Sequence, residues 1–345
     1  MASITLRNGR KVADYTNPYV VAELNTSHFG DLKLAKLMIA KAKEVGCDCV
    51  KFQSWSTDSL YAKSFYKENK ITKRIINKFS LDQIALKTLA DYSKDIGIDF
   101  SSTPYAREEA EFLINECQVP FVKIASMELN NLPYLGFLGR LSVPLVLSTG
   151  MGTLEEIVRA VRTIDDAGNK QIIILHCNST YPLPSAAARL HNIIGLRTEF
   201  PQYPIGYSDH TIGSEIPTAA VALGACLIEK HFTLDSNRIG MDNQMASEPA
   251  EMKDMIDKCR VVQVALGGAG RILDETERAQ APKMRRSLVT ALPLKAGHVL
   301  CEVDLDAKRP GNGIPPSDVE LVIGKRLKVD LDEGELITFE HFENT

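Results

Sequence analysis

The stretch YVVAELNTSHFGDLKLAKLMIAKAKEVGCDCVKFQS, residues 19–54, contains one complete copy of the pattern that decides the fold. A β-branched run, YVVAELN (19–25), precedes a segment with helical spacing of apolar residues that closes at a glycine (32–46). A second short run, DCVKFQS (48–54), follows. Strand, helix and strand in succession predict parallel pairing with a right-handed crossover.

Six further runs of the same kind continue this rhythm. They are DFSSTPY (99–105), FVKIASM (121–127), PLVLSTG (144–150), IIILHCN (172–178), PIGYSDH (204–210) and CLIEKHF (226–232). Eight such units favour a closed TIM (β/α)8 barrel over an open doubly wound sheet. Because a barrel needs about 250 residues, the 345-residue chain predicts a barrel with a small second domain.

The character of the sequence changes after residue 268. We predict a TIM-barrel catalytic domain over 1–268, a charged, non-periodic linker over 269–286 and a compact β-rich domain over 287–345, where short alternating strands are separated by Gly, Pro and Asp. Residues 55–80 interrupt the rhythm between the second and third strands. Such a long βα loop usually shapes a substrate site.

The composition excludes several classes of protein. A formal charge of −4 offers no broad attraction to nucleic acid, and the longest apolar stretch is far short of the roughly 20 residues that cross a bilayer. Seven scattered cysteines without a CxxC pair indicate reduced, buried thiols. The sequence therefore predicts a cytoplasmic protein that binds neither nucleic acid nor membrane.

Nearly every predicted strand ends in polar or charged side chains. A parallel barrel gathers the carboxyl ends of its strands around one mouth, where its chemistry is built. We therefore expect these residues to converge and the chain to be an enzyme. They are Glu23, Lys51, Gln53, Lys123, Ser148, Ser208, His210 and His231.

His210 and His231 end the last two strands. Neutral imidazoles are common ligands of divalent metals, and two from neighbouring strands could meet at one ion that acts as a Lewis acid. Alternation places Glu229 on the face of His231, and Ser208 on the face of His210. Two histidines satisfied by ordinary hydrogen bonds are the competing interpretation, and spacing alone weighs the two about evenly.

Lys51 and Gln53 share one face of the second strand, and Lys123 adds a second cation. Together with hydroxyls at Ser148 and Ser208 they suit a small dianion such as a phosphate. The alternative is that Lys123 forms a Schiff base with a ketone, as in lysine-dependent aldolases.

Four other positions are ambiguous from local sequence. Ser126 and Glu128 share a face with each other but not with Lys123, so we expect the strand to end near Ser126 and Glu128 to lie on the following loop. Judged alone, Asp242 in the loop after the last strand and Arg309 in the KRPGNGI turn (308–314) are solvated surface residues.

Nine motifs, in this order, closely resemble the sialic acid synthase family, whose members make nine-carbon ulosonic acids. They are AELN (22–25), VKFQS (50–54), SSTP (101–104), VKIASMEL (122–129), LSTGM (147–151), LHCNSTYP (175–182), GYSDHT (206–211), EKHFTLD (229–235) and KRPGNGI (308–314). The resemblance covers essentially the whole chain.

This resemblance implies a TIM barrel followed by an antifreeze-like (SAF) domain, in a domain-swapped homodimer where the small domain covers the partner's barrel mouth. It also implies that phosphoenolpyruvate condenses with an N-acylated hexosamine and releases phosphate. N-acetylneuraminate synthase, which acts on N-acetylmannosamine, is the first expectation. A legionaminic or pseudaminic acid synthase, which acts on a 2,4-diacetamido-hexose, is the alternative.

The resemblance also assigns residue roles. It implies that His210 and His231 bind a divalent cation, typically manganese, with magnesium or cobalt as alternatives. It implies phosphoenolpyruvate contacts from Lys51, Gln53, Lys123, Ser126, Ser148, Ser179 and Ser208. It implies an acid–base role for Glu23, and sugar contacts from Glu128, Tyr181, Asp242 and the partner-delivered Arg309. For the proton transfers themselves, Glu128 is the alternative to Glu23 as catalytic residue. The family carries Asn where this chain has Ser179, with Asn178 before it, so which of the two contacts ligand stays open.

Overall fold

The computed structural model describes residues 1–268 and 270–343. The chain forms two compact units, Met1–Gly267 and Gly268–Thr345. Each is described by itself.

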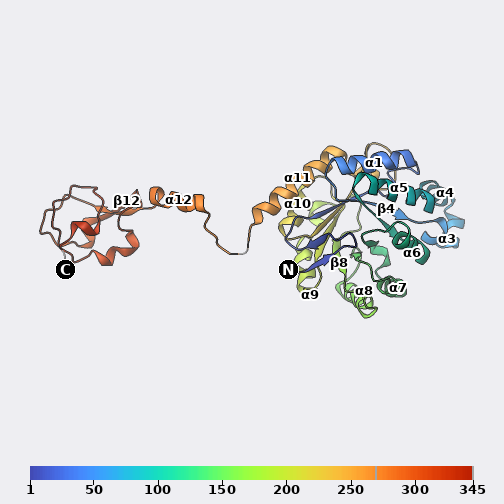
Figure 1. Cartoon of the computed structure of the whole chain (residues 1–345), viewed down its shortest axis with the longest axis horizontal. Helices are drawn as coiled ribbons and strands as arrows, with labels where there is room; N and C mark the ends of the chain where they lie inside the picture. The colour runs from blue at the N-terminus through green and yellow to red at the C-terminus, as the bar shows by residue number, and fades with distance from the viewer. Residues whose placement is uncertain (269, 344–345) are drawn as a thin grey trace. The chain divides into compact units, whose positions relative to one another are not determined.

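The first unit is built on eight parallel strands with helices around them (Figure 1). The strands are β3 (Tyr19–Glu23), β4 (Cys49–Ser54), β5 (Asp99–Pro104), β6 (Val122–Ile124), β7 (Leu145–Ser148), β8 (Ile172–Cys177), β9 (Ile205–Asp209) and β10 (Leu227–His231). They pair in the order β5-β4-β3-β10-β9-β8-β7-β6. Almost all of their residues are buried, as expected when both faces of a parallel sheet are covered. The predicted TIM-like fold is confirmed.

The seam of the barrel and the end where its strands begin are closed in different ways. Between β5 and β6 no backbone ladder is present in the described part of the chain, but the Ser101 hydroxyl donates a hydrogen bond to the Phe121 carbonyl at 2.9 Å. At the end where the strands begin, the hairpin of β1 (Ser3–Thr5) and β2 (Lys11–Ala13) packs Ile4 and Val12 against the interior of the barrel. The candidate functional site lies at the opposite end, where the strands finish.

Helices cover the outside of the strands. They are α1 (Leu32–Glu44), α5 (Gln83–Ile96), α6 (Arg107–Asn115), α7 (Leu132–Arg140), α8 (Leu154–Asp166), α9 (His191–Glu199), α10 (Glu215–Ala222) and α11 (Pro249–Leu266). Local sequence sets several of their ends. The Asp31 side chain caps α1, and Thr153 with Glu156 forms a capping box at the start of α8. No helix in the described ranges has the length and apolar character to cross a membrane.

The insertion between β4 and β5 is mostly helical, although the sequence predicted a long loop. It forms α2 (Thr57–Leu60), α3 (Lys63–Glu68) and α4 (Lys70–Phe79). The Ser56 hydroxyl caps α2, and α4 buries Ile76. These helices are too short for periodicity to reveal them.

The second unit contains fewer regular strands than the sequence predicted. Helix α12 (Glu275–Met284), which the loss of periodicity did not predict, begins at an Asp274 cap. The strands are β11 (Ser287–Thr290) and β12 (Leu305–Lys308), which pair antiparallel. Most other pairings are isolated bridges, such as Leu294 with Leu331, because Gly, Pro and Asp interrupt longer ladders. A small apolar core holds the unit together.

Candidate active site

A cavity of about 400 Å³ lies at the carboxyl ends of the barrel strands. Most of the residues predicted for the site line it. They are Glu23, Lys51, Gln53, Lys123, Ser126, Ser148, Ser179, Tyr181, Ser208, His210, His231 and Asp242. Side chains spread over more than 200 residues of sequence are therefore brought to one place by the topology of the barrel.

Two predicted residues do not line this cavity. Glu128 ends the 3-10 helix Ser126–Glu128, is buried, and accepts a hydrogen bond from the Asn131 amide at 2.8 Å. Burial raises the pKa of this carboxyl. Arg309 lies in the second unit, directly after β12, where its side chain is exposed.

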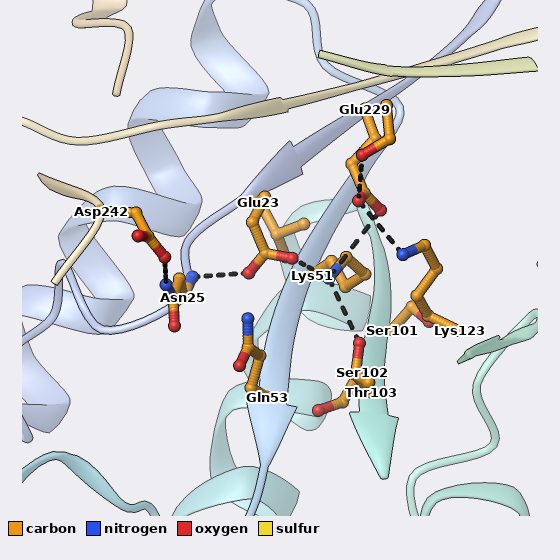
Figure 2. Close-up of polar contacts among 12 residues, drawn as sticks. Glu23, Asn25, Lys51, Gln53, Ser101, Ser102, Thr103, Lys123, Glu229 and Asp242 are labelled. Atoms are coloured by element: carbon orange, nitrogen blue, oxygen red, sulfur yellow. Dashed lines mark hydrogen bonds and ion pairs between the residues drawn. The ribbon is translucent and has the colours of Figure 1, made fainter. Parts of the chain in front are cut away.

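Four charged side chains that line the cavity contact one another, as Figure 2 shows, and we call this group the ion-paired floor. Lys51 on β4 makes an ion pair with Glu23 on β3, and its ammonium nitrogen lies 3.8 Å from Glu229 Oε2. Lys123 on β6 lies 3.2 Å from Glu229 Oε1. Lys51 also donates a hydrogen bond to Thr103 Oγ1 at 3.3 Å. All four charges are buried, and their formal charges cancel in pairs.

Glu229 joins the two lysines, a role that the sequence did not assign to it. Its Oε1 atom also accepts a hydrogen bond from Ser208 at 3.0 Å. Burial by itself would raise the pKa of Glu229, but the ammonium groups of Lys123 and Lys51 hold it below its usual value. The available signal was the alternation that placed Glu229 on the inward face with His231.

Burial lowers the pKa of Lys51 from 10.5 to about 7, although the Glu229 carboxylate acts in the opposite direction. The physical cause is that a buried ammonium loses its hydration. A proton on Lys51 therefore depends on nearby negative charge, which an anionic ligand would add.

The two histidines meet at the rim of the same cavity. The centroids of the His210 and His231 rings are 5.4 Å apart, and the Tyr181 ring lies 4.2 Å from that of His210. His210 Nδ1 lies 2.6 Å from the Asn178 carbonyl. Because a carbonyl only accepts, Nδ1 carries the hydrogen and Nε2 keeps its lone pair. Burial lowers the pKa of both rings, which favours neutral imidazole.

Three hydroxyls lie on the side of the cavity formed by β6, β7 and β8. Ser148 Oγ is buried and has no hydrogen-bond partner in the described ranges. Ser126 Oγ accepts a hydrogen bond from the Gly150 amide at 3.0 Å. A Cβ on Gly150 would lie 2.3 Å from Ser179 Oγ, so only glycine fits beside these hydroxyls. Of the two ambiguous residues, Ser179 lines this cavity, whereas Asn178 lines a neighbouring one.

A short hydrogen-bonded chain links two acidic residues on the opposite side (Figure 2). The Asn25 side-chain amide donates to Asp242, and the Asn25 backbone amide donates to Glu23 Oε1 at 2.7 Å. Asp242 is half-buried rather than solvated, and burial raises its pKa. The isolated sequence of its loop gave no signal for this position.

A buried ion pair lies directly behind the histidines. Lys230 donates hydrogen bonds to Asp209 Oδ2 at 2.5 Å and to the Thr211 carbonyl at 2.7 Å. Asp209 precedes His210 and Lys230 precedes His231, so the pair ties the ends of β9 and β10 together. Sequence reasoning missed it because these two residues alternate away from the cavity.

A parallel barrel with buried lysines, carboxylates and imidazoles at its carboxyl end defines a TIM-barrel enzyme. The NeuB family model matches residues 38–271, and the SAF domain model matches residues 285–343. The chain belongs to the NeuB family, and the resemblance to sialic acid synthases with a C-terminal SAF domain is confirmed.

Relatives of the chain carry the names of several nonulosonic acid synthases. It is 35% identical over 338 residues to the N,N'-diacetyllegionaminic acid synthase of Legionella pneumophila, covering 94% of each chain. It is 33% identical over 348 residues to the human N-acetylneuraminate-9-phosphate synthase, covering 97% of this chain and 96% of the relative. A crystal structure of N-acetylneuraminic acid synthetase from Leptospira borgpetersenii is 30% identical with a TM-score of 0.74, covering 81% of this chain and 94% of that one.

Proposed function

We propose that this protein condenses phosphoenolpyruvate with an N-acylated hexosamine in the cytoplasm to give a nine-carbon ulosonic acid and phosphate. The observation that carries the proposal is that two lysines, two glutamates and two imidazoles line one cavity. Family membership supports the same class of reaction. N-acetylneuraminate synthesis is the first candidate, and legionaminic acid synthesis is the second because two relatives carry that name.

The lysines and hydroxyls suit the anionic substrate. Lys123 and Lys51 supply positive charge, and the unpaired Ser148 hydroxyl supplies a hydrogen bond that the protein leaves unused. Ser126, Ser179, Ser208 and Gln53 line the same space. Binding the phosphate there would orient the enol methylene toward the sugar aldehyde and stabilise phosphate as it leaves.

The carboxylates would accept and donate protons during the reaction. Carbon–carbon bond formation leaves a cationic centre at C2 of the pyruvyl unit, which captures water and then loses phosphate through C–O cleavage. Water loses a proton and the aldehyde oxygen gains one. Glu23 is the better placed of the two candidate residues, because it lines the cavity and contacts Lys51, whereas Glu128 does not line it.

His210 and His231 fit a divalent cation. Their rings share the cavity, His210 Nε2 keeps its lone pair, and burial favours the neutral form of both. The described residues contain no cluster of three or more His, Cys, Asp or Glu side chains placed for a metal, so water and substrate would complete the coordination. When bound, such an ion supplies Lewis-acid polarisation of the sugar carbonyl.

The Lys51 ammonium predicts a pH dependence. Its pKa in the folded protein, about 7, lies below its ordinary value of 10.5, so its positive charge fades as pH rises through this window. We expect kcat/KM for phosphoenolpyruvate to fall on the alkaline side, measured as phosphate release across pH. A Lys51→Arg variant should lose that limb because guanidinium does not titrate there. An unchanged limb in the variant would contradict the assignment.

We also propose a domain-swapped homodimer in which Arg309 of one chain reaches the partner's barrel mouth. Arg309 is exposed and free to meet a ligand. Arg309→Ala should then lower kcat/KM for the sugar by about 10- to 100-fold, the range for one charge-assisted hydrogen bond. Lys308→Ala, which removes a neighbouring surface cation, is the control. Equal effects of the two substitutions would refute the shared site. So would a protein that is fully active but is a monomer in analytical ultracentrifugation.

The proposed function is tested by phosphate release from phosphoenolpyruvate. The acceptor panel contains N-acetylmannosamine, 6-deoxy diacetamido-hexoses and mannose. Release with an acylated sugar is expected, and release with none of them would overturn the proposal. The Schiff-base alternative predicts that borohydride traps pyruvate on Lys123. The ion pair of Lys123 with Glu229 argues against this route, since a free amine is the nucleophile.

A further inference from the structure

Trp55, the only tryptophan of the chain, directly follows β4 at the mouth of the barrel. Lys51, Gln53 and Trp55 occupy alternate positions, and all three line the cavity. Along one strand the cavity wall therefore changes from a cation in the ion-paired floor to an amide and then to an indole ring. Neither the sequence motifs nor the charge cluster assigned a role to Trp55.

The indole nitrogen of Trp55 is unsatisfied. The residue is only 7% exposed, and its Nε1–H is shielded from solvent without a hydrogen-bond partner among residues 1–268 and 270–343. A buried donor without an acceptor is costly, and such groups in native proteins call for an explanation. An acceptor carried by a ligand would supply one.

Aromatic and aliphatic side chains contribute to the cavity wall on which Trp55 lies. The Tyr105 ring lies 5.9 Å from the Trp55 ring, and Leu60 and Tyr61 from the insertion line the same cavity. The Tyr105 hydroxyl already donates a hydrogen bond to Gln53 Oε1 at 3.1 Å. This part of the cavity therefore offers aromatic surface and the indole N–H donor of Trp55.

We propose that Trp55 determines acceptor specificity by receiving an acylamino group of the sugar. An acylamino group combines a methyl group, which would pack on the aromatic wall, with a carbonyl oxygen, which would accept from the indole N–H. A hydroxyl-rich face of a sugar lacks the methyl group that would pack on the aromatic wall. Because Nε1 is shielded, a ligand reaches it only when a side chain that covers it moves. The inference rests on the proposed function and deepens it.

The single tryptophan provides a direct binding signal. Intrinsic fluorescence of the wild-type protein should change on titration with N-acetylmannosamine or a diacetamido-hexose, and should not change with mannose. The Trp55→Phe variant lacks this emission and shows that the signal comes from Trp55. An identical response to mannose and to the acylated sugars would overturn the proposal.

Steady-state kinetics provide the second test. Trp55→Phe keeps an aromatic ring but removes the donor, so KM for the acylated sugar should rise about 3- to 10-fold. KM for phosphoenolpyruvate and the melting temperature should stay unchanged. Tyr66→Phe is the matched control, since its hydroxyl is also buried and unpartnered in the described structure but does not line the cavity. An unchanged sugar KM in Trp55→Phe, or an equal rise in both variants, would refute the role of Trp55.

The two proposals fail in different ways. If no acylated sugar supports phosphate release by the wild-type protein, the proposed function is wrong, while the fluorescence titration still decides whether Trp55 responds to an acylamino group. If phosphate is released but Trp55→Phe leaves selectivity between acylated sugars and mannose unchanged, only the specificity role is wrong.

Discussion

A Glu229→Gln variant is expected to lose about 100-fold or more in kcat/KM for phosphoenolpyruvate. Its free energy of unfolding should also fall by about 3 kcal/mol. The wild-type carboxylate lies between Lys123, at 3.2 Å, and Lys51, at 3.8 Å. Glutamine keeps the shape but removes the charge, which leaves Lys51 paired with Glu23 and takes away the carboxylate that pairs with Lys123. The uncompensated positive charge would destabilise the fold and disturb the orientation of both lysines.

Phosphate-release kinetics and urea denaturation measure the two effects separately. Glu44→Gln is the control, because Glu44 also pairs with a lysine, at 2.6 Å, but on an exposed helix surface. Exposed pairs contribute about 0–1 kcal/mol. If Glu229→Gln unfolds at the same urea concentration as Glu44→Gln, the buried cluster does not stabilise the barrel as argued. Wild-type kinetics in a folded Glu229→Gln protein would remove Glu229 from the site.

The convergence of the site could be predicted because two regular rules combine. Strand alternation fixes which residues face inward, and parallel topology fixes which end they share. Glu23, Lys51, His210 and His231 follow these rules. The rules do not predict which side chains pair, and the structure shows the contact of Glu23 with Lys51.

The rules fail where the strand has already ended. Residues 126–128 form a 3-10 turn after the short strand β6, so Ser126 lines the cavity although alternation from Lys123 would direct it away. Glu128, two residues later, turns toward Asn131 instead. A single turn of this kind depends on contacts with neighbouring loops that spacing does not encode.

Contacts between distant loops could not be predicted from the sequence either. Asp242 accepts a hydrogen bond from Asn25, which is 217 residues away in the chain. The unsatisfied Trp55 nitrogen appears only when every neighbour of the ring is placed. Resemblance to a family recovered Asp242 where local reasoning did not, but it gave no role for Trp55.

A His231→Ala variant is expected to lose more than about 100-fold in affinity for Mn²⁺ and nearly all phosphate release. The physical reason is that His210 and His231 are the two imidazoles that line the cavity in the described chain. Their ring centroids are 5.4 Å apart. The electron paramagnetic resonance signal of free Mn²⁺ reports binding without requiring turnover.

His176→Gln is the buried control, because His176 bonds to the Ala188 carbonyl at 2.7 Å and does not line this cavity. Wild-type protein treated with a chelator should lose activity and regain it when Mn²⁺ is added. Full activity after chelation, or equal Mn²⁺ binding by His231→Ala and His176→Gln, would show that the two histidines do not form a metal site.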